Sequence, residues 1–460
     1  MIEHSMTTGR YQCVNPQYSF AAEDWVLCDD CFAGEREIKR RGEVYLPRTE
    51  GQMADPKYGS KRYEAYKYRA NFFNYFASTI NAVLGILHRE PPQRLELPPR
   101  LHVMQRNFSA SGDSLEEMLH LVNFHQLVYG RCGMLLDAPF WDDSPNAVPV
   151  AALYPAHRIL DWEQNGNVLS FVLLDESGDQ FNPELKCREH VQRLRLCALD
   201  RNGEYYSIQL TPQEYSRFDF SAEMPDSVYP EIRGKRLGKV PFIFVNTSDT
   251  TPMIQAPPLL PLANICLAIY RGEADYRHAL YMQAQSTLFL KGFPLDDPPM
   301  MGAGNYIHTE SPDAAGSFLE ISGAGLSEMR ESLAELHKTA VSMGMSLAEN
   351  GDSESGEALK TRLSVKLALL ENLANTSGAA FRKILRLAAE WCSVDPDTVL
   401  FEPNLDFTES SVSASDVSYL WNAKKEGLPL SERSIHEWLR KNDYTGLSYE
   451  EELEEEKQGN

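Results

Sequence analysis

The chain alternates between stretches whose apolar residues recur at helical spacing and one central region of short alternating strands. Two helices are predicted at the start, over about residues 21–41 and about residues 61–88, with a polar, turn-rich link at residues 49–60. The second helix carries aromatic residues too densely for a surface face, so we expect it to be buried on more than one side. These aromatic residues are Phe72, Phe73, Tyr75 and Phe76.

A third helix is predicted from about Ser114 to Tyr129. Either Asp113 or Ser114 is the expected N-cap, because a short polar side chain there accepts from a free backbone N–H of the first turn. Glu116 and Glu117 lie in that first turn, where the helix dipole favours acidic side chains. Gly130 is expected to end the helix.

Residues 133–210 change to a strand pattern and predict an antiparallel β region. Two Asn-Gly pairs, Asn165-Gly166 and Asn202-Gly203, lie between apolar runs and predict hairpins with type I′ turns, in which both central residues have positive φ. A further strand is predicted at residues 240–245. In the second hairpin we expect one face to be formed by Leu194, Leu196 and Ala198 opposite Tyr206, Ile208 and Leu210.

The second half of the chain predicts a helix at residues 259–285, a loop-rich interval at 286–325 and another helix at 326–345. The last of these has apolar residues at alternating steps of three and four, which is the period of a helix packed lengthwise against its neighbours. Those residues are Leu326, Met329, Leu333, Leu336, Ala340 and Met343.

A polar stretch at residues 346–356 separates that helix from a long one at residues 357–391, about 52 Å if unbroken. One apolar stripe runs along it, so we expect the opposite face to stay polar or to meet another subunit. The stripe is Leu359, Leu363, Leu367, Leu370, Ala374, Phe381, Ile384 and Ala388. Residues 393–460 predict two or three short helices, and Glu occupies six of the seven positions 450–456, which is typical of a solvated tail.

Length and charge limit the function classes. The 460 residues exceed a single core of about 250 to 300, so several subdomains or a large assembly subunit are expected. The longest apolar window, residues 254–270, is interrupted by three prolines, and the first residues lack a basic segment followed by an apolar core, so neither a membrane span nor a secretory signal is predicted. The net charge of −22 argues against a sequence-reading nucleic-acid binder, but an acidic lining would let DNA slide past without adhering.

The candidate chemical residues do not assemble into a site. Eight scattered cysteines favour free thiols, and the pair Cys28 and Cys31 lacks two further ligands at close spacing, so both are expected to be small residues on a helix. His120 and His125 are about 500° apart around their helix, so we expect two partly buried polar residues and no shared metal.

No enzymatic motif is present in the sequence: there is no phosphate-binding loop, no GxGxxG after a strand, no GxSxG and no HExxH. The acidic pairs Asp142-Asp143 and Asp296-Asp297 lie in Pro-rich loops, where solvated turn residues are common. The sequence therefore predicts no catalytic residue, no cofactor and no metal site.

The segment at residues 33–48, AGEREIKRRGEVYLPR, reads as a charged helix that stops at Gly42 and an extended exit over residues 45–48. With Trp25 before it and the predicted helical run of residues 62–92 after it, this segment resembles the amino-terminal region of one family of tailed-bacteriophage portal proteins. Four later phrases are similar to that family: KVPFIFVNTSD from Lys239, PPLLPLANICLAIYRGEADYRHAL from Pro257, SGEALKTRL from Ser355 and NLDFTES from Asn404. The first twenty residues and the acidic tail have no counterpart in this pattern.

The resemblance implies an α+β portal fold in which an α/β wing is followed by a two-helix stem, a clip, a tunnel loop, a long wing helix and a small helical crown. The implied boundaries are wing 1–258, stem helices 259–285 and 326–345, clip 286–325, tunnel loop 346–356, long wing helix 357–392, and crown with acidic tail 393–460.

It also implies a function. Portal proteins form rings, usually of twelve subunits, at one capsid vertex, and double-stranded DNA is packaged and ejected through the channel without sequence-specific binding. The implied partners are the terminase large subunit, head-completion, adaptor or tail proteins, and capsid and scaffold proteins. The implied location is the virion, after assembly in the host cytoplasm, with no membrane, cofactor or enzymatic activity. The implied contact residues are Glu349, Asn350, Asp352, Ser353 and Glu354 in the tunnel loop, and Asp296, Asp297, Tyr306 and His308 in the clip.

Two alternatives stay open. A minor capsid or adaptor protein could share helical rods without forming a channel. A soluble enzyme could build a deep polar pocket from scattered residues such as Asp137, His157 and Asp161. Neither alternative accounts for the pair of helices broken at residues 346–356 or for the order of the phrases.

Overall fold

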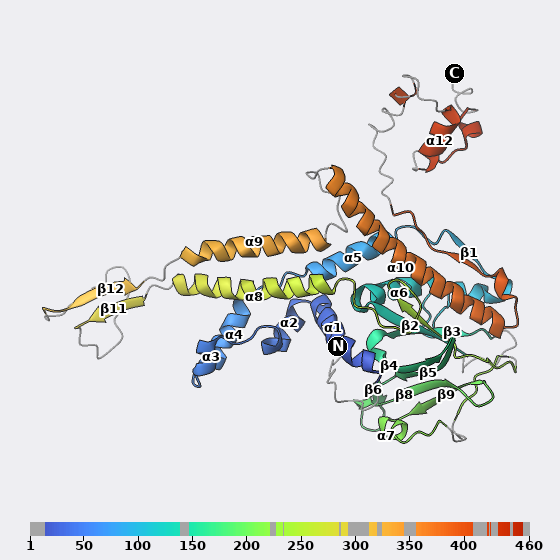
Figure 1. Ribbon diagram of the computed structural model, residues 1–460, viewed down its shortest axis with the longest axis horizontal. Coiled ribbons are helices and arrows are strands. Elements are labelled where there is room, and N and C mark those ends of the chain that lie inside the picture. The colour runs from blue at the N-terminus through green and yellow to red at the C-terminus, as the bar shows by residue number, and fades with distance from the viewer. Residues whose placement is uncertain are drawn as a thin grey trace. The chain divides into compact units, whose positions relative to one another are not determined.

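The computed structural model describes residues 14–138, 147–220, 227–232, 234–284, 287–292, 312–319, 324–344, 356–407, 421–422, 424, 431–441 and 445–453. The chain divides into two compact units, Met1–Leu405 and Asp406–Asn460, and each is described by itself (Figure 1). The first unit is a mixture of helices and antiparallel sheets, so the predicted α+β class is confirmed.

Two helices replace the single one predicted at residues 21–41. Helix α1 spans Pro16–Ala33 and α2 spans Glu35–Arg41, and Gly34 between them has a φ of 88°, which breaks the helix. Gly42 ends α2 as predicted. A 3₁₀ turn over Gly42–Val44 follows, and Tyr45 keeps helical backbone angles, so the extended exit begins later than predicted.

The segment at residues 33–48 ties the first helices together. Asp30 of α1 is fully buried and accepts hydrogen bonds from Arg41 at 3.0 Å and from the Tyr45 hydroxyl at 2.5 Å. The Tyr63 hydroxyl donates to the carbonyl oxygen of Leu46 at 2.9 Å. Arg41 and Tyr45 of this segment are therefore structural, because they donate hydrogen bonds to a buried carboxylate that would otherwise have unsatisfied oxygens.

The prediction of one continuous helix at residues 61–88 is wrong. The segment forms two helices, α4 at Gly59–Arg69 and α5 at Tyr75–Leu87. Asn74 caps α5 by accepting from the Ala77 N–H at 2.9 Å, and residues 70–74 are not helical. In this break the Phe72 ring packs edge-on against Tyr270, a contact that a continuous helix would not direct.

The predicted turn-rich link contains a further short helix, α3 at Glu50–Ala54. Its start is a capping box in which Thr49 and Gln52 exchange hydrogen bonds with each other's backbone N–H groups.

Helix α6, Leu115–Tyr129, agrees with its prediction at both ends. Ser114 is the N-cap and forms a capping box with Glu117, and Gly130 ends the helix with a φ of 71°.

The strand prediction is confirmed. A three-stranded antiparallel sheet has β2 (Arg131–Asp137) between β3 (Val150–Pro155) and β10 (Phe242–Asn246). A four-stranded antiparallel sheet has the order β4-β5-β8-β9, with bounds Ile159–Asn165, Val168–Asp175, Leu194–Leu199 and Tyr205–Leu210. In its β8–β9 hairpin the two predicted sets of residues face each other, and the observed pairs are Leu194 with Leu210, Leu196 with Ile208 and Ala198 with Tyr206.

The type I′ turns are wrong, although both hairpins exist. Positive φ occurs at Gly166 and Gly203, whereas among the described residues Asn165, Asn167 and Asn202 do not have it. The first loop is Gly166-Asn167 with positive φ at its first residue, as a type II′ turn requires. The second loop has five residues between Leu199 and Tyr205, too many for a two-residue turn.

Helix α10, Gly356–Trp391, covers the three-stranded sheet together with α6 (Figure 1). The predicted stripe is buried from Leu370 onward, and the opposite face stays polar in this half, where Asn372, Asn375 and Lys383 are exposed. Leu373, Leu385 and Leu387 are buried as well, so the apolar arc is wider than one stripe.

Helix α8, Leu260–Gln283, and helix α9, Ala324–Gly344, lie side by side, and a hairpin of β11 (Thr287–Lys291) and β12 (Ala315–Leu319) is inserted between them in the chain (Figure 1). The predicted helices at 259–285 and 326–345 are thus confirmed, whereas β11 and β12 lie inside the interval predicted as loop.

The smaller elements of the first unit are β1 at Arg94–Glu96, β6 at Gly178–Asn182, β7 at Cys187–Val191, α7 at Pro212–Tyr215 and β13 at Leu400–Glu402, with 3₁₀ helices at Pro99–Gln105, Ala156–Arg158 and Pro396–Thr398.

The second unit contains α12 at Glu432–Lys441 and a helical segment at residues 449–453. The His436 ring and the Glu452 carboxylate are hydrogen-bond partners between the two. Residues 450–453 of the acidic tail are helical, and residues 454–456 lie outside the described residues. No helix in the described part of the chain is long and apolar enough to cross a membrane.

Candidate functional site

Helices α8 and α9 run antiparallel and meet tightly at two glycines. A Cβ at Gly344 of α9 would lie 2.2 Å from the Thr79 hydroxyl of α5 and 3.1 Å from Leu262 of α8, and a Cβ at Gly272 of α8 would lie 2.9 Å from Leu333 of α9. Because Leu262 meets the end of α9 while Gly272 meets its middle, the two helices have opposite directions.

The predicted apolar stripe of α9 forms this contact. Leu333 and Ala340 are buried, and Leu326, Met329 and Leu336 are half-buried. Met343 does not follow the pattern, because it is 39% exposed. The spacing of three and four therefore identified the face of α9 that packs on α8.

The variant Gly344→Val is expected to lower the free energy of unfolding by about 1 to 3 kcal/mol, because its side chain would overpack the junction of α5, α8 and α9. Urea denaturation of the full-length chain, followed by circular dichroism, measures the change. Gly325→Val is the matched control on the same helix, since nothing lies within 4 Å of a Cβ there. Equal effects of the two variants would show that the junction is not tightly packed.

A buried carboxylate joins three helices at the same level. Glu273 of α8 is 7% exposed and accepts from Arg277 Nε at 2.5 Å. His337 Nε2 of α9 lies 4.0 Å from the other carboxylate oxygen, and His337 Nδ1 is 2.9 Å from the Tyr75 hydroxyl of α5. The relative positions of α5, α8 and α9 are thus held by polar contacts as well as by packing.

Helix α4 is attached to α8 by a second set of contacts. The Tyr66 hydroxyl donates to Asp275 at 2.5 Å, and burial followed by this hydrogen bond raises the pKa of Tyr66. The Arg69 guanidinium lies 4.1 Å from the Tyr281 ring centroid and 3.3 Å from His278 Nδ1. Burial, and then the charge of Arg69, lowers the pKa of His278, so a neutral imidazole faces the guanidinium.

The residues predicted to contact DNA and the packaging motor lie outside the described part of the chain. This holds for Glu349, Asn350, Asp352, Ser353 and Glu354, and for Asp296, Asp297, Tyr306 and His308. The described hairpin strands next to the second group pair in register, with Phe289 opposite Ser317 and Leu288 opposite Phe318. Phe289 and Phe318 are 51% and 56% exposed.

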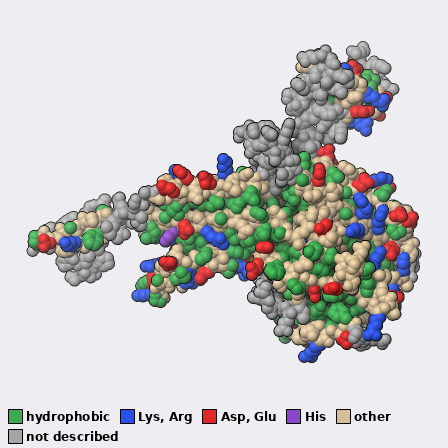
Figure 2. Space-filling view, viewed as in Figure 1, with side chains coloured by type: hydrophobic (Ala, Val, Ile, Leu, Met, Phe, Trp, Pro, Cys, Tyr) green, Lys and Arg blue, Asp and Glu red, His purple; other side chains and the backbone are tan. Residues whose placement is uncertain are grey.

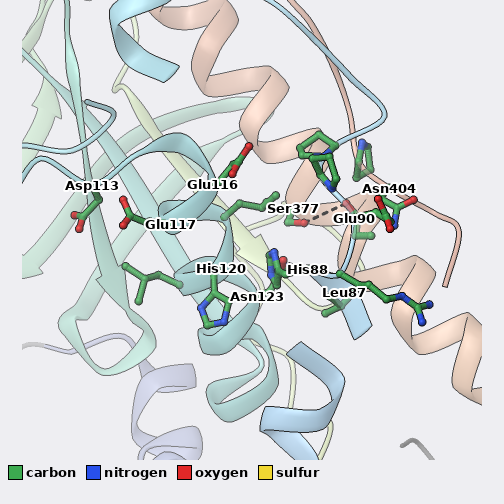
Figure 3. A pocket seen from close by; sticks show the side chains of 17 residues that line it. Leu87, His88, Glu90, Asp113, Glu116, Glu117, His120, Asn123, Ser377 and Asn404 are labelled. Atoms are coloured by element: carbon green, nitrogen blue, oxygen red, sulfur yellow. Dashed lines mark hydrogen bonds between the residues drawn. The ribbon is translucent and has the colours of Figure 1, made fainter. Parts of the chain in front are cut away.

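A pocket of about 670 Å³ lies where the ends of α5 and α6 meet α10 (Figure 3). Its lining includes Leu87, His88, Glu90, Asp113, Glu116, Glu117, His120, Asn123, Ser377 and Asn404. The His88 and His120 ring centroids are 4.9 Å apart. The sequence did not indicate this pairing, because His88 follows the end of α5, His120 lies in α6, and the two are 32 positions apart.

His120 is exposed, so its predicted partly buried position is wrong, whereas the half-buried His125 agrees with the prediction. The two side chains have different surroundings, because His125 stacks on Tyr129 with centroids 5.6 Å apart. In the described residues no three His, Cys, Asp or Glu side chains converge as a metal site requires.

Cys28 and Cys31 are fully buried under α8, where the Cys31 thiol lies 3.9 Å from the Ala263 carbonyl oxygen. Burial raises the pKa of both thiols. Thiols that stay protonated are poor nucleophiles and poor metal ligands, so these positions behave as small core residues.

The three residues of the enzyme alternative each have a structural partner. Asp137 accepts from Arg195 at 2.5 Å, and Asp161 accepts from the Asn15 side-chain amide at 3.2 Å. The Tyr129 ring packs edge-on against His157 with centroids 5.4 Å apart. These contacts give each residue a role in holding the fold.

Acidification is expected to destabilise the protein between pH 6.5 and pH 4. Burial lowers the pKa of His88 and His125 to about 4, with the neighbouring His120 adding to the effect at His88. The unfolded chain takes up protons at these histidines near pH 6.5 while the folded chain does not, so stability is present above that pH and is lost as the pH falls. Each histidine contributes at most about 3 kcal/mol over this window.

Urea midpoints measured from pH 7 to pH 4 check this expectation. His125→Gln should flatten the profile, and His190→Gln, on the exposed strand β7, should leave it unchanged. A wild-type stability that stays constant down to pH 4.5 would contradict the prediction.

Comparison with known proteins gives one family match and several loose structural matches. A family described as "Domain of unknown function (DUF4055)" matches residues 258–392, which contain α8, β11, β12, α9 and α10. No curated protein matches the chain.

Among solved structures, a chain of "Virion of native gene transfer agent (GTA) particle" is similar with a TM-score of 0.40 and 13% identity over 80% of this chain and 88% of that one. Chains of "Neck of empty GTA particle computed with C6 symmetry" and "Neck of native GTA particle computed with C12 symmetry" have TM-scores of 0.39 and 0.37, with identities of 13% and 12%; they cover 78% and 79% of this chain and 88% and 89% of their own. With overlaps this loose, a functional proposal rests on the chain's own sequence and geometry.

Proposed function

We propose that this chain is a portal protein, the ring-forming connector of a tailed-phage-like particle through which double-stranded DNA is packaged and ejected. One observation carries the proposal. Two antiparallel helices, α8 and α9, enclose a chain excursion that contains a β hairpin, and α9 is followed by a polar stretch and the 36-residue helix α10. This is the order of stem, clip, second stem helix, tunnel loop and long wing helix that the sequence resemblance implies.

The proposed roles follow this order. The tunnel loop, with Glu349, Asn350, Asp352, Ser353 and Glu354, lies next to the passing DNA and repels it, in keeping with a chain of net charge −22. The clip docks the terminase large subunit during packaging and head-completion, adaptor or tail proteins afterwards. Its proposed contact residues are Asp296, Asp297, Tyr306 and His308. The protein has no enzymatic role in this scheme.

Exposed apolar side chains on the helix pair and the hairpin support an assembled state. Between 39% and 56% of each side chain is accessible in the single chain. Subunits arranged around an axis would cover such residues, as protein interfaces usually do. They are Leu280, Tyr281, Met282, Phe289, Phe318, Val341 and Met343.

The test is the native mass of the purified full-length chain, with electron-microscope images of the same sample. Twelve chains of 52.0 kDa make a particle of about 624 kDa, and rings of about this mass with a central hole are expected. A monomer or dimer at every concentration would refute the proposal. The number of copies per virion separates a portal, with one ring, from a minor capsid or adaptor protein.

A further inference from the structure

Helices α4 and α9 lie on opposite sides of α8 (Figure 1). Helix α4 contacts α8 at Asp275, His278 and Tyr281, which form one stripe. Helix α9 contacts α8 at Leu262, Gly272 and Glu273. At about 100° per residue the mean directions of the two stripes differ by about 180°. One protomer therefore presents two separate outer surfaces, one on each side of the same helix.

The outer face of α9 carries an acidic row. Glu328, Glu331 and Glu335 follow one another at steps of three and four, are exposed, and point away from the buried Leu333 and Ala340. Glu331 and Glu335 are one helical turn apart, a like-charge spacing that destabilises an isolated helix. Among the described residues neither of these two carboxylates has an ion-pair partner.

The outer face of α4 has the opposite character. Lys61 and Tyr68 lie on the side of α4 away from the buried Tyr63 and Tyr66, and the exposed Lys57 lies in the turn just before the helix. Tyr68 is 83% exposed, and tyrosine is among the residues enriched at the energetic centres of interfaces. In Figure 2, acidic side chains with a few basic ones lie along the outer edge of α9, and the α3–α4 projection carries both Lys or Arg and acidic side chains.

We propose that the α4 face of one copy, defined as Lys57, Lys61 and Tyr68, binds the α9 face of the next copy, defined as Glu328, Glu331 and Glu335. Two complementary surfaces on opposite sides of one protomer make a head-to-tail contact, and such a contact closes into a ring when its rotation permits. The charges set the partner and the register, and Tyr68 supplies apolar contact area. This inference rests on the proposed ring and names the surfaces that close it.

Charge reversal tests the contact with the full-length chain. Lys57→Glu with Lys61→Glu, and separately Glu331→Lys with Glu335→Lys, are expected to raise the chain concentration needed for half-maximal ring formation at least about tenfold. The chain carrying all four substitutions should form rings again, because the charges are then exchanged between the faces. Its net charge equals that of the wild type, so restoration cannot come from overall charge.

Lys186→Glu with Arg188→Glu is the matched control for the Lys57 and Lys61 variant, since it makes the same change in net charge on the exposed β6–β7 hairpin. It should form rings like the wild type. Native mass across concentrations and circular dichroism, which confirms folding, are the measurements. Undiminished rings in both double variants, or no recovery in the fourfold variant, would overturn the contact. A wild-type chain that never forms rings would instead refute the proposed function.

Discussion

Replacing Phe381 with alanine is expected to lower the free energy of unfolding of the first unit by about 3 to 5 kcal/mol. Phe381 of α10 is fully buried, and its ring lies between Phe108 and Phe401, with centroid distances of 5.4 Å and 5.6 Å and interplanar angles of 22° and 23°. The substitution would remove both ring contacts and leave a cavity under α10, because the neighbours belong to separate segments that cannot easily close it.

Urea denaturation of the full-length chain, followed by circular dichroism, measures the loss. Phe20→Ala on α1 is the matched control, because the Phe20 side chain is 88% exposed and its removal leaves no cavity. A change within about 0.5 kcal/mol is expected for the control. A similarly small change for Phe381→Ala would mean that α10 is not anchored through this stack.

Gly130→Val is expected to have the second large effect, a loss of about 3 to 5 kcal/mol from two causes that add. Gly130 has a φ of 71°, a conformation that is strained for a β-branched residue. A Cβ there would also lie 2.8 Å from the backbone oxygens of Gln255 and Ala256. Neither oxygen belongs to a flexible side chain, so the connection between α6 and β2 would have to move.

Gly112→Val separates the two causes. Gly112 has a φ of 90°, but nothing lies within 4 Å of a Cβ at this position, so only the backbone strain of about 1 to 3 kcal/mol is expected. The difference between the two variants, measured by the same denaturation experiment, reports the close approach of residues 255–256. If both variants lose the same stability, steric overlap at Gly130 makes no contribution.

Assembly of the proposed ring depends on Gly130 and Phe381 because both positions fix segments next to the helix pair in the chain. Gly130 meets the segment just before α8, and Phe381 holds α10, which follows α9 in the chain. We therefore expect folded protein from either variant to assemble less well, since these two positions fix the segments that precede α8 and follow α9 in the chain.

Local sequence patterns predicted the features that depend on residues close together in the chain. Ser114, Glu117 and Gly130 mark the ends of α6, because capping uses hydrogen bonds within one turn. Alternation placed Leu194, Leu196 and Ala198 across the hairpin from Tyr206, Ile208 and Leu210, but the register did not follow, because a two-residue turn would have shifted it by one position. The exact turn types did not follow, because Asn-Gly pairs also occur in loops where only the glycine has positive φ.

Features that depend on distant contacts were missed. The helix predicted at residues 61–88 is interrupted because Phe72 and Phe73 leave the helical path to meet Tyr270 and His337, about 200 or more positions away. The wider buried arc of α10 was also missed. The single stripe indicated only the most apolar residues, whereas the three-stranded sheet, α6 and β13 also bury the leucines on either side of it.

The sequence by itself determined the order and type of the main elements and the resemblance to portal proteins, because helical spacing, caps and short hairpins act over a few residues. The tertiary structure alone decided where those elements meet. The His88–His120 pair, the glycine contacts between α8 and α9, and the charged faces of α4 and α9 on opposite sides of α8 join residues far apart in the chain. Such juxtapositions arise from packing of whole helices around a shared core, which no local pattern encodes.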